Sequence, residues 1–294
     1  MSKILVTAAN GQLGQLAVRQ LLGRVPADRI VAGVRRLESA GPLEQLGVEV
    51  RYLDYEKAET LESALSGVGR VLLISSSEVG KRAAQHLRVI EAASRARVDL
   101  LVYTSLLRAD SSPLALGVEH LATEKALAAW NVAYTVLRNG WYTENLTAGI
   151  PAALAHGAVL GSSGEGKISA ASRLDYAEAA AIVLTRPSMV SGLVYELAGD
   201  AAFSKAEFAR EVSELSGREV AYKNLTQEEY QSALEGAGLP APFANILADS
   251  DAGTANGALF DEKGELAQLL GRPTTDWRQT VAEAVSRLES GSAA

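Results

Sequence analysis

Short apolar runs alternate with longer amphipathic segments through the first 140 residues, and this alternation restricts the fold more than any other feature of the sequence. Runs rich in β-branched residues predict strands at 4–8, 29–34, 49–53, 70–74, 100–104 and 133–137. Apolar residues three and four positions apart predict helices between them, at 12–22, 38–46, 57–65, 80–96 and 118–129. Because crossover connections are right-handed, we predict an α/β protein with a doubly wound parallel sheet of Rossmann type.

The pattern changes after Asn139-Gly140-Trp141. A helix from about Asp175 and a strand at 194–197 are expected to return to the main sheet, whereas residues 203–288 favour helices with one strand near 219–222. We therefore predict a Rossmann domain of residues 1–150 with a return segment at about 175–198. Residues 151–174 and 199–294 are expected to form a smaller, mainly helical second domain.

Composition excludes several classes of function. The net charge of −7 argues against binding to nucleic acid, which needs a basic face, and the absence of cysteine excludes thiolate chemistry. With three histidines and no H-E-x-x-H motif, no metal site is expected. A strand pattern that begins at once leaves no room for a signal peptide, and no apolar run is long enough for membrane insertion. We expect a cytoplasmic protein.

The first predicted strand leads into a turn with two glycines, Thr7-Ala8-Ala9-Asn10-Gly11-Gln12-Leu13-Gly14. Gly11 permits close approach of the backbone to a ligand, and Gly14 permits close packing of helix on strand. The positive end of the helix would face a pyrophosphate. Glycines after a strand also occur in ordinary turns, but this turn opens the first strand-helix unit, where a dinucleotide fold places its phosphate loop.

The end of the second strand indicates which dinucleotide is bound. An NAD site places a carboxylate there, but this chain reads Gly33-Val34-Arg35-Arg36 and has no acid before Glu38. Arg35 can offer charge-assisted donors to a 2′-phosphate, and Arg36 can flank the adenine. The sequence therefore predicts NADPH, the alternative being a solvated arginine pair at a strand end.

Polar residues follow the other predicted strands at the same edge of the sheet. Asp54 lies near the adenine or caps the next helix, and Ser75, Ser76 and Ser77 follow the fourth strand, where a ribose would pass or where they cap a helix. Tyr103, Thr104 and Ser105 close the fifth strand and complete the candidates for cofactor contact.

No dedicated proton donor is evident. Enzymes that reduce ketones with a Tyr-x-x-x-Lys pair use a tyrosine as acid, but the matching segment here is Leu121-Ala-Thr-Glu-Lys125. Hydride transfer to a quinone gives a stabilised phenolate and needs no such acid, so a quinone is the predicted substrate. Asn139 is a candidate to hold the nicotinamide or a quinone oxygen. Trp141 and Tyr142 are candidates for the wall of a flat slot, or core aromatics.

Several long segments resemble a known family, the NmrA-like atypical short-chain dehydrogenase/reductases, and within it the bacterial NADPH:quinone oxidoreductases. The similar segments are Gly11-Gln-Leu-Gly14, Leu73-Ile-Ser-Ser-Ser-Glu-Val-Gly80, Tyr103-Thr-Ser-Leu-Leu107, Thr123-Glu-Lys125, Arg138-Asn-Gly-Trp-Tyr142, Glu196-Leu-Ala-Gly-Asp200 and Leu247-Ala-Asp-Ser-Asp251. The resemblance implies an NADPH-binding first domain, a second domain for the substrate, and reduction of quinones. It implies cofactor contacts at Gly11–Gly14, Arg35, Ser75, Ser76, Ser77, Asn139, Gly140, Trp141, Tyr142, Thr143 and Glu144, with Lys167 and Arg173 near the site.

Two positions depart from the family's usual residues, since Ala8 and Asn10 replace Gly and Thr. The methyl group of Ala8 is compatible with cofactor binding if the φ angle of this residue is negative. Two alternative functions stay open. One is a non-catalytic NmrA-like redox sensor, and the other is an NADPH-dependent triarylmethane dye reductase, which His120-Leu-Ala-Thr-Glu124 also resembles. A homodimer is compatible with each.

Overall fold

A computed structural model describes residues 2–188 and 190–291, which divide into two compact units. The first unit comprises residues 1–110, 118–139 and 173–196, and the second comprises 111–117, 140–172 and 197–294. The chain passes from the first unit to the second after Asn139, where the sixth strand ends. The expected boundary at 150 lies eleven residues later.

The first unit is built on a seven-stranded sheet with the order β3-β2-β1-β4-β5-β6-β9. Its strands are β1 (Lys3–Val6), β2 (Ile30–Val34), β3 (Glu49–Tyr52), β4 (Val68–Leu73), β5 (Leu100–Leu106), β6 (Tyr134–Asn139) and β9 (Leu193–Leu197). The pairs from β3 through β6 are parallel. β9 is parallel to β6, because hydrogen bonds join the starts of the two strands and also their ends. At the start Gly192 N–H donates to the Tyr134 carbonyl, and at the end Gly140 N–H donates to the Leu197 carbonyl. The doubly wound sheet is confirmed, and its strand ends meet at one edge.

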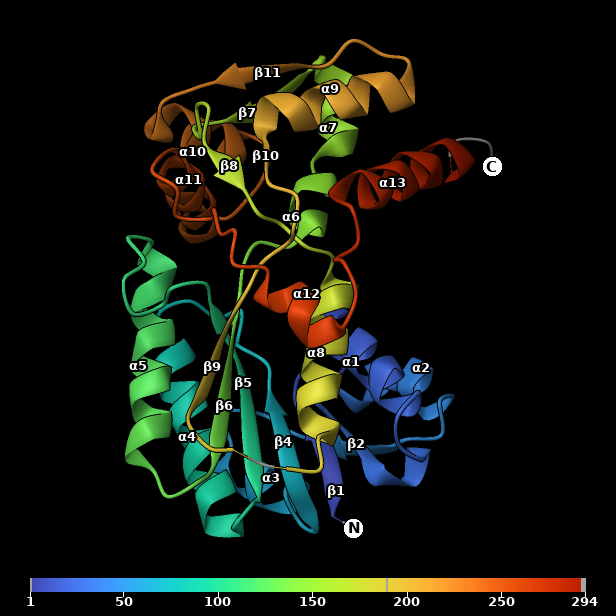
Figure 1. Cartoon of the computed structure of the whole chain (residues 1–294), viewed down its shortest axis with the longest axis vertical. Coiled ribbons are helices and arrows are strands. Elements are labelled where there is room, and N and C mark those ends of the chain that lie inside the picture. Colours follow the sequence, from blue (N-terminus) through green and yellow to red (C-terminus); the bar gives the residue numbers. More distant parts are fainter. Residues whose placement is uncertain (1, 189, 292–294) are drawn as a thin grey trace. The chain divides into compact units, whose positions relative to one another are not determined.

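Helices cover the sheet on both faces. They are α1 (Gln12–Leu22), α2 (Gly41–Glu44), α3 (Ala58–Ala64), α4 (Arg82–Ala96), α5 (Ala115–Ala129) and α8 (Arg173–Thr185), with short 3-10 turns η1 (Ala27–Arg29) and η2 (Leu37–Ser39). α1 packs against α8 and α3 packs against α4, and these pairs lie on opposite sides of the sheet (Figure 1). Strands buried on both faces explain the continuous apolar runs in the sequence. The helix expected at 38–46 is only the four-residue α2 after η2.

The second unit combines helices with two small sheets. Its helices are α6 (Thr143–Thr147), α7 (Ile150–His156), α9 (Lys205–Ser216), α10 (Gln227–Gly236), α11 (Ala241–Ala255), α12 (Glu265–Leu270) and α13 (Trp277–Gly291). β7 (Ala158–Gly161) pairs in parallel with β11 (Ala221–Asn224), and β8 (Lys167–Ile168) pairs antiparallel with β10 (Phe203–Ser204). Ser204 and Glu207 form a capping box that starts α9. Phe203 stacks on Trp277 with ring centroids 4.1 Å apart.

Candidate functional site

The turn between β1 and α1 contains a residue in the left-handed region. Ala8 has a φ angle of +47°, so the condition of a negative angle, under which the sequence made its methyl group compatible with the cofactor, is not met. The turn still closes, since Gly11 N–H donates to the carbonyl of Ala8 over 2.9 Å and Ala9 N–H donates to that of Gly33 over 3.0 Å. The methyl group is therefore tolerated, at a typical cost of about 1–2 kcal/mol for an L-residue in this region.

The start of α1 has the features of a phosphate-binding helix end. A Cβ at position 14 would lie 2.7 Å from Cα of Ala9 and would overlap the carbonyl of Ala8, so glycine alone lets α1 approach the turn this closely. Gly11 supplies no capping side chain and the first turn carries no acidic residue. The N–H groups of that turn and the positive helix end therefore suit a pyrophosphate, and this part of the chain fits a dinucleotide.

Thr7 ties the turn to the neighbouring strand. Its buried hydroxyl donates to the carbonyl of Leu72 over 3.0 Å and accepts from Ile74 N–H over 3.0 Å. The Tyr55 hydroxyl lies 2.5 Å from the same oxygen, and burial raises the pKa of Tyr55. The side chain of Thr7 was expected at the cofactor, but its hydrogen-bonding capacity is used inside the protein. Thr7 therefore positions the turn.

An ion pair closes the side of the site that follows β2. Arg35 is 60% exposed, and its Nη1 lies 2.5 Å from Oε1 of Glu78, which comes from the segment after β4. This hydrogen bond to Arg35 is the main reason that the pKa of Glu78 is lowered. Lys81 Nζ lies 3.6 Å from the other carboxylate oxygen. Asn10 lies at the same end, where its amide donates to Ser39 over 2.9 Å.

The serine segment after β4 is anchored by buried groups. Ser75 N–H donates to Thr104 Oγ1, and Ser76 N–H donates to Nε2 of His86, each over 2.9 Å. Arg82 Nε donates to the Ser76 carbonyl over 2.6 Å. These bonds fix the backbone of the segment from beneath and leave Ser75, Ser76 and Ser77 lining a cleft.

Two histidines and a tyrosine form the buried support of this segment. Because His86 accepts a backbone N–H at Nε2, its proton lies on Nδ1, which faces Thr123 Oγ1 at 2.9 Å. His120 Nδ1 lies 2.7 Å from the Tyr103 hydroxyl. Burial lowers the pKa of His86 to about 3 and lowers that of His120 well below its usual value, so both imidazoles are neutral at pH 7. Tyr103 is fully buried between them, and burial raises its pKa.

The cleft enclosed by these elements has a volume of about 300 Å³ and belongs entirely to the first unit. It brings together Ala8, Asn10, Gly11, Gln12, Leu13, Gly14, Arg35, Asp54, Ser75, Ser76 and Ser77, all expected from the sequence. It also includes Leu53, Tyr55, Ile74, Glu78 and Gln85, which were not expected. Asp54 lines it while its carboxylate accepts from Glu56 N–H over 3.0 Å, as in a turn.

The residues expected from the end of β5 do not line this cleft. Tyr103 packs against the histidines, the Thr104 hydroxyl accepts from Ser75, and the Ser105 hydroxyl donates to Glu124 over 2.5 Å. All three side chains are buried. Because β5 is buried on both faces, its residues support the neighbouring segment and have no surface to offer a ligand.

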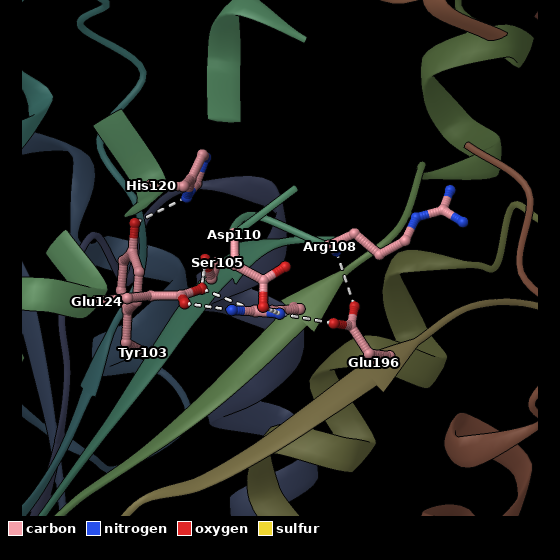
Figure 2. A network of polar contacts seen from close by, with 8 residues as sticks. Tyr103, Ser105, Arg108, Asp110, His120, Glu124 and Glu196 are labelled. Carbon is pink, nitrogen blue, oxygen red and sulfur yellow. Dashed lines mark hydrogen bonds and ion pairs between the residues drawn. The ribbon is translucent and has the colours of Figure 1, made fainter. Parts of the chain in front are cut away.

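A buried guanidinium, that of Arg138 on β6, bonds to three carboxylates near the ends of β5 and β9 and on α5. Figure 2 labels these carboxylates, which are those of Asp110, Glu124 and Glu196. Arg138 donates to Glu124 over 2.7 Å, to Glu196 over 2.8 Å and to Asp110 over 2.9 Å. Burial alone would lower the pKa of Arg138, but these hydrogen bonds raise it above its usual value. The cluster holds the strand end immediately before Asn139, and Asn139 in turn accepts from Leu107 N–H over 3.0 Å.

The remaining predicted residues lie in other parts of the chain. Gly140, Trp141, Tyr142, Thr143, Glu144 and Lys167 belong to the second unit, and Arg173 begins α8 of the first. Within the second unit, Ala171 N–H donates to the Trp141 carbonyl over 3.1 Å and Thr143 N–H donates to the Ala171 carbonyl over 3.0 Å. The segment 140–144 is therefore a neighbour of Ala171, which lies between the predicted residues Lys167 and Arg173. Among the described residues, no group of three or more histidines and acids could hold a metal ion.

Comparisons with known proteins agree with this geometry. The model of a family described as NAD(P)H-binding matches residues 8–187, which hold the turn, the serine segment and their buried support. This chain belongs to the NAD(P)H-binding family. Within that family it is similar to Quinone oxidoreductase 2 of Escherichia coli strain K12, with 50% identity over 97% of this chain and 98% of that protein.

Two solved structures of similar proteins extend the NAD(P)H-binding family relationship to three dimensions. The NADPH complex of the quinone oxidoreductase QOR2 from Escherichia coli has a TM-score of 0.91 and 49% identity, covering 97% of this chain and 99% of that one. The triphenylmethane reductase of Citrobacter sp. with NADP(H) has a TM-score of 0.91 and 36% identity, covering 96% and 100%. The predicted fold and the resemblance to NmrA-like quinone oxidoreductases are thereby confirmed.

Proposed function

We propose that this protein binds NADPH and reduces a quinone by hydride transfer. The observation that carries the proposal is the combination of the cleft, with Arg35 where a 2′-phosphate would lie, and 50% identity over almost the whole chain to Quinone oxidoreductase 2. The bound dinucleotide would supply the hydride, and one proton from solvent completes the hydroquinone.

Three groups of residues in the first unit would hold the phosphates and the adenosine ribose of the cofactor. The first turn of α1, with Gly11 and Gly14, would face the pyrophosphate, and Arg35 would bind the 2′-phosphate. Ser75, Ser76 and Ser77, held from beneath by His86, would line the ribose path. Asn139 and the segment Gly140–Glu144 would lie toward the nicotinamide and the acceptor, with Trp141 and Tyr142 as walls. We also propose that Lys167 and Arg173 lie near this part of the site.

The chemistry suits an acceptor that needs no strong acid. Burial raises the pKa of both Tyr55 and Tyr103, the opposite of what a catalytic tyrosine requires. Lys125 is exposed and lies in a segment with leucine in place of the usual tyrosine. A quinone accepts hydride to give a phenolate, which takes its proton from water, whereas an aliphatic ketone would give a strongly basic alkoxide.

The decisive experiment measures turnover with the purified full chain. We expect the nicotinamide absorbance of NADPH to fall when 1,4-benzoquinone or a naphthoquinone is added, with one hydroquinone formed per NADPH. Tight NADPH binding without turnover across a quinone panel would instead identify a redox sensor of the NmrA type.

A second candidate activity is the reduction of triarylmethane dyes. The similarity to the Citrobacter sp. triphenylmethane reductase, at 36% identity over 96% of this chain, favours it. Hydride addition to the central carbon of a cationic dye requires no proton, so the same site chemistry serves both acceptors. Decolorisation of crystal violet at a higher kcat/KM than that for any quinone would make the dye the preferred substrate class.

A cytoplasmic location and a homodimer are further parts of the proposal. No helix within residues 2–188 and 190–291 combines the length and apolar character that a membrane span needs. A reducing compartment suits a chain without cysteine. Sedimentation of the purified chain measures its oligomeric state directly.

A further inference from the structure

Glu78 occupies a place in the cofactor cleft that the known requirements of an NADPH site do not explain. Its carboxylate lines the cleft and contacts Arg35, the arginine expected to bind the 2′-phosphate. A phosphate that approaches Arg35 therefore meets a negative charge already bound there.

The position of Glu78 is fixed by the buried support. Its backbone N–H donates to Ser76 Oγ over 3.1 Å, and the Ser76 backbone is bonded to His86 and Arg82. The Glu78 side chain is 32% exposed, and Lys81 lies 3.6 Å from the carboxylate oxygen that does not contact Arg35. The carboxylate thus has a second cation to which it can turn when Arg35 is engaged.

The two common solutions to cofactor choice are both present in this cleft. An NAD site uses an acid at the end of the second strand to accept from the ribose 2′-hydroxyl, and an NADP site uses an arginine for the 2′-phosphate. Here the arginine comes from the end of β2, while the acid comes from the segment after β4.

We propose that Glu78 determines the preference between NADPH and NADH. It competes with the 2′-phosphate for Arg35 and accepts a hydrogen bond from the free 2′-hydroxyl of NADH. With NADPH bound, the carboxylate moves from Arg35 toward Lys81; with NADH bound, it stays with Arg35. Glu78 therefore lowers the affinity for NADPH and raises that for NADH. This inference rests on the proposed binding of NADPH, but it requires no quinone.

The Glu78→Gln variant separates charge from shape, because the amide keeps the size of the side chain but removes its negative charge. An exposed ion pair of this kind is worth a few tenths to one kcal/mol, so we expect NADPH to bind about 2–5-fold more tightly. NADH should bind about 2–5-fold more weakly, since an amide accepts from a hydroxyl less strongly than a carboxylate. The two cofactors are expected to respond with opposite sign.

The experiment measures dissociation constants of NADPH and NADH by isothermal titration calorimetry, without acceptor, for the wild type, Glu78→Gln, Arg35→Ala and the double variant. Arg35→Ala should weaken NADPH binding about 10–150-fold, as for a lost hydrogen bond between charged groups, and should spare NADH. In the Arg35→Ala background, Glu78→Gln should improve NADPH binding less, because the competition for Arg35 is gone and only direct repulsion between the carboxylate and the 2′-phosphate is left.

Glu62→Gln is the matched control, since Glu62 forms an exposed ion pair with Arg95, 3.6 Å apart, outside the cleft. It should leave both dissociation constants unchanged. Equal changes in the dissociation constants of NADPH and NADH in Glu78→Gln, or no change in either, would overturn this inference but not the proposed function. An undiminished gain for NADPH in the double variant would also overturn it. If no variant binds either dinucleotide, the proposed function falls together with it.

Discussion

At the scale of single residues, Ala8 shows how a turn can keep its shape with an unfavourable side chain. The bonds from Gly11 and Ala9 close the turn around a residue with positive φ, where glycine has no steric penalty. The sequence reveals that a glycine of the usual pattern is replaced, but the sign of φ depends on where β1 ends, which periodicity does not resolve to one residue.

Ala8→Gly should stabilise the protein. Relief of the left-handed strain, about 1–2 kcal/mol, is partly offset by the greater freedom of glycine in the unfolded chain, which leaves a gain of about 0.5–1 kcal/mol. Denaturant unfolding of the two proteins measures the difference. Ala9→Gly is the control, since Ala9 is fully buried and its φ is not positive. It should lose stability, and a gain there as well would refute the strain explanation.

The roles of Glu78 and His86 show what residue patterns leave undetected. Glu78 lies 43 positions from Arg35, so no local motif announces that they meet. His86 lies three and four positions before Val89 and Ile90, on the buried face of α4, but this spacing does not show that its ring accepts a backbone hydrogen bond. Both contacts depend on the sheet order, which places β4 next to β1 and the segment after it opposite the end of β2.

At the scale of elements, the segment after β4 depends on two helices for its shape. α4 supplies His86 and Arg82, while α5 supplies Thr123 and His120. The arrangement requires His86 to be neutral, because a protonated ring would present N–H where it must accept from Ser76. Protonation should therefore loosen the serine segment.

This requirement predicts a loss of stability in mild acid. A histidine with a folded pKa of about 3 and an unfolded pKa of 6.5 takes up its proton only on unfolding between these values, so stability falls as pH falls through this range. Between pH 7 and pH 5 His86 should contribute a loss of about 2 kcal/mol, and His120 adds in the same direction.

Denaturant unfolding at pH 7 and pH 5 tests this expectation. His86→Gln can accept from Ser76 through its amide oxygen but does not titrate, so its stability should fall less over this range than that of the wild type. The carboxyl group of Glu49, whose pKa is lowered to about 2 mainly by its hydrogen bond to Arg51, contributes mostly below pH 5. An equal pH dependence of variant and wild type would contradict the role of His86.

The elements of the first unit followed from the sequence more directly than those of the second. β4 and β5 are buried on both faces and produce apolar runs that few other structures explain. In the second unit, β8 and β10 are two residues long and pair only with each other. Two residues are too few to show the alternation of apolar and polar side chains that predicts a strand. α6 and α7 lie in the stretch after Trp141, where short helices have too few residues for a recognisable apolar face.

At the scale of the whole molecule, the nucleotide-binding unit is discontinuous in sequence. Residues 140–172 belong to the second unit, and the chain returns afterwards to provide α8 and β9. α8 packs on α1, and Arg24 of the segment after α1 lies 3.5 Å from Glu178 of α8. Arg70 of β4 also donates to the carbonyl of Arg186, 2.9 Å away, just after α8. The return segment is thus part of the core structure of this unit.

A fragment of residues 1–139 should therefore fail to fold cooperatively. It contains every residue that lines the cleft but lacks α8 and β9, so the part of α1 that packs on α8 would face water. A fragment of residues 1–197 restores both elements and should regain a cooperative transition. Thermal unfolding followed by circular dichroism compares them, and a sharp transition in the shorter fragment would show that the return segment is dispensable.

The packing of α8 on α1 also has a consequence for the protein during its synthesis. Leu13, Ala17, Val18 and Leu21 are buried on α1, whose partner helix ends about 160 residues later in the chain. While the ribosome adds the intervening residues, the part of this surface that packs on α8 has no native partner and is available to chaperones or to other nascent chains. The side of α1 that α8 covers in the folded protein therefore stays exposed until most of the first unit has been synthesised.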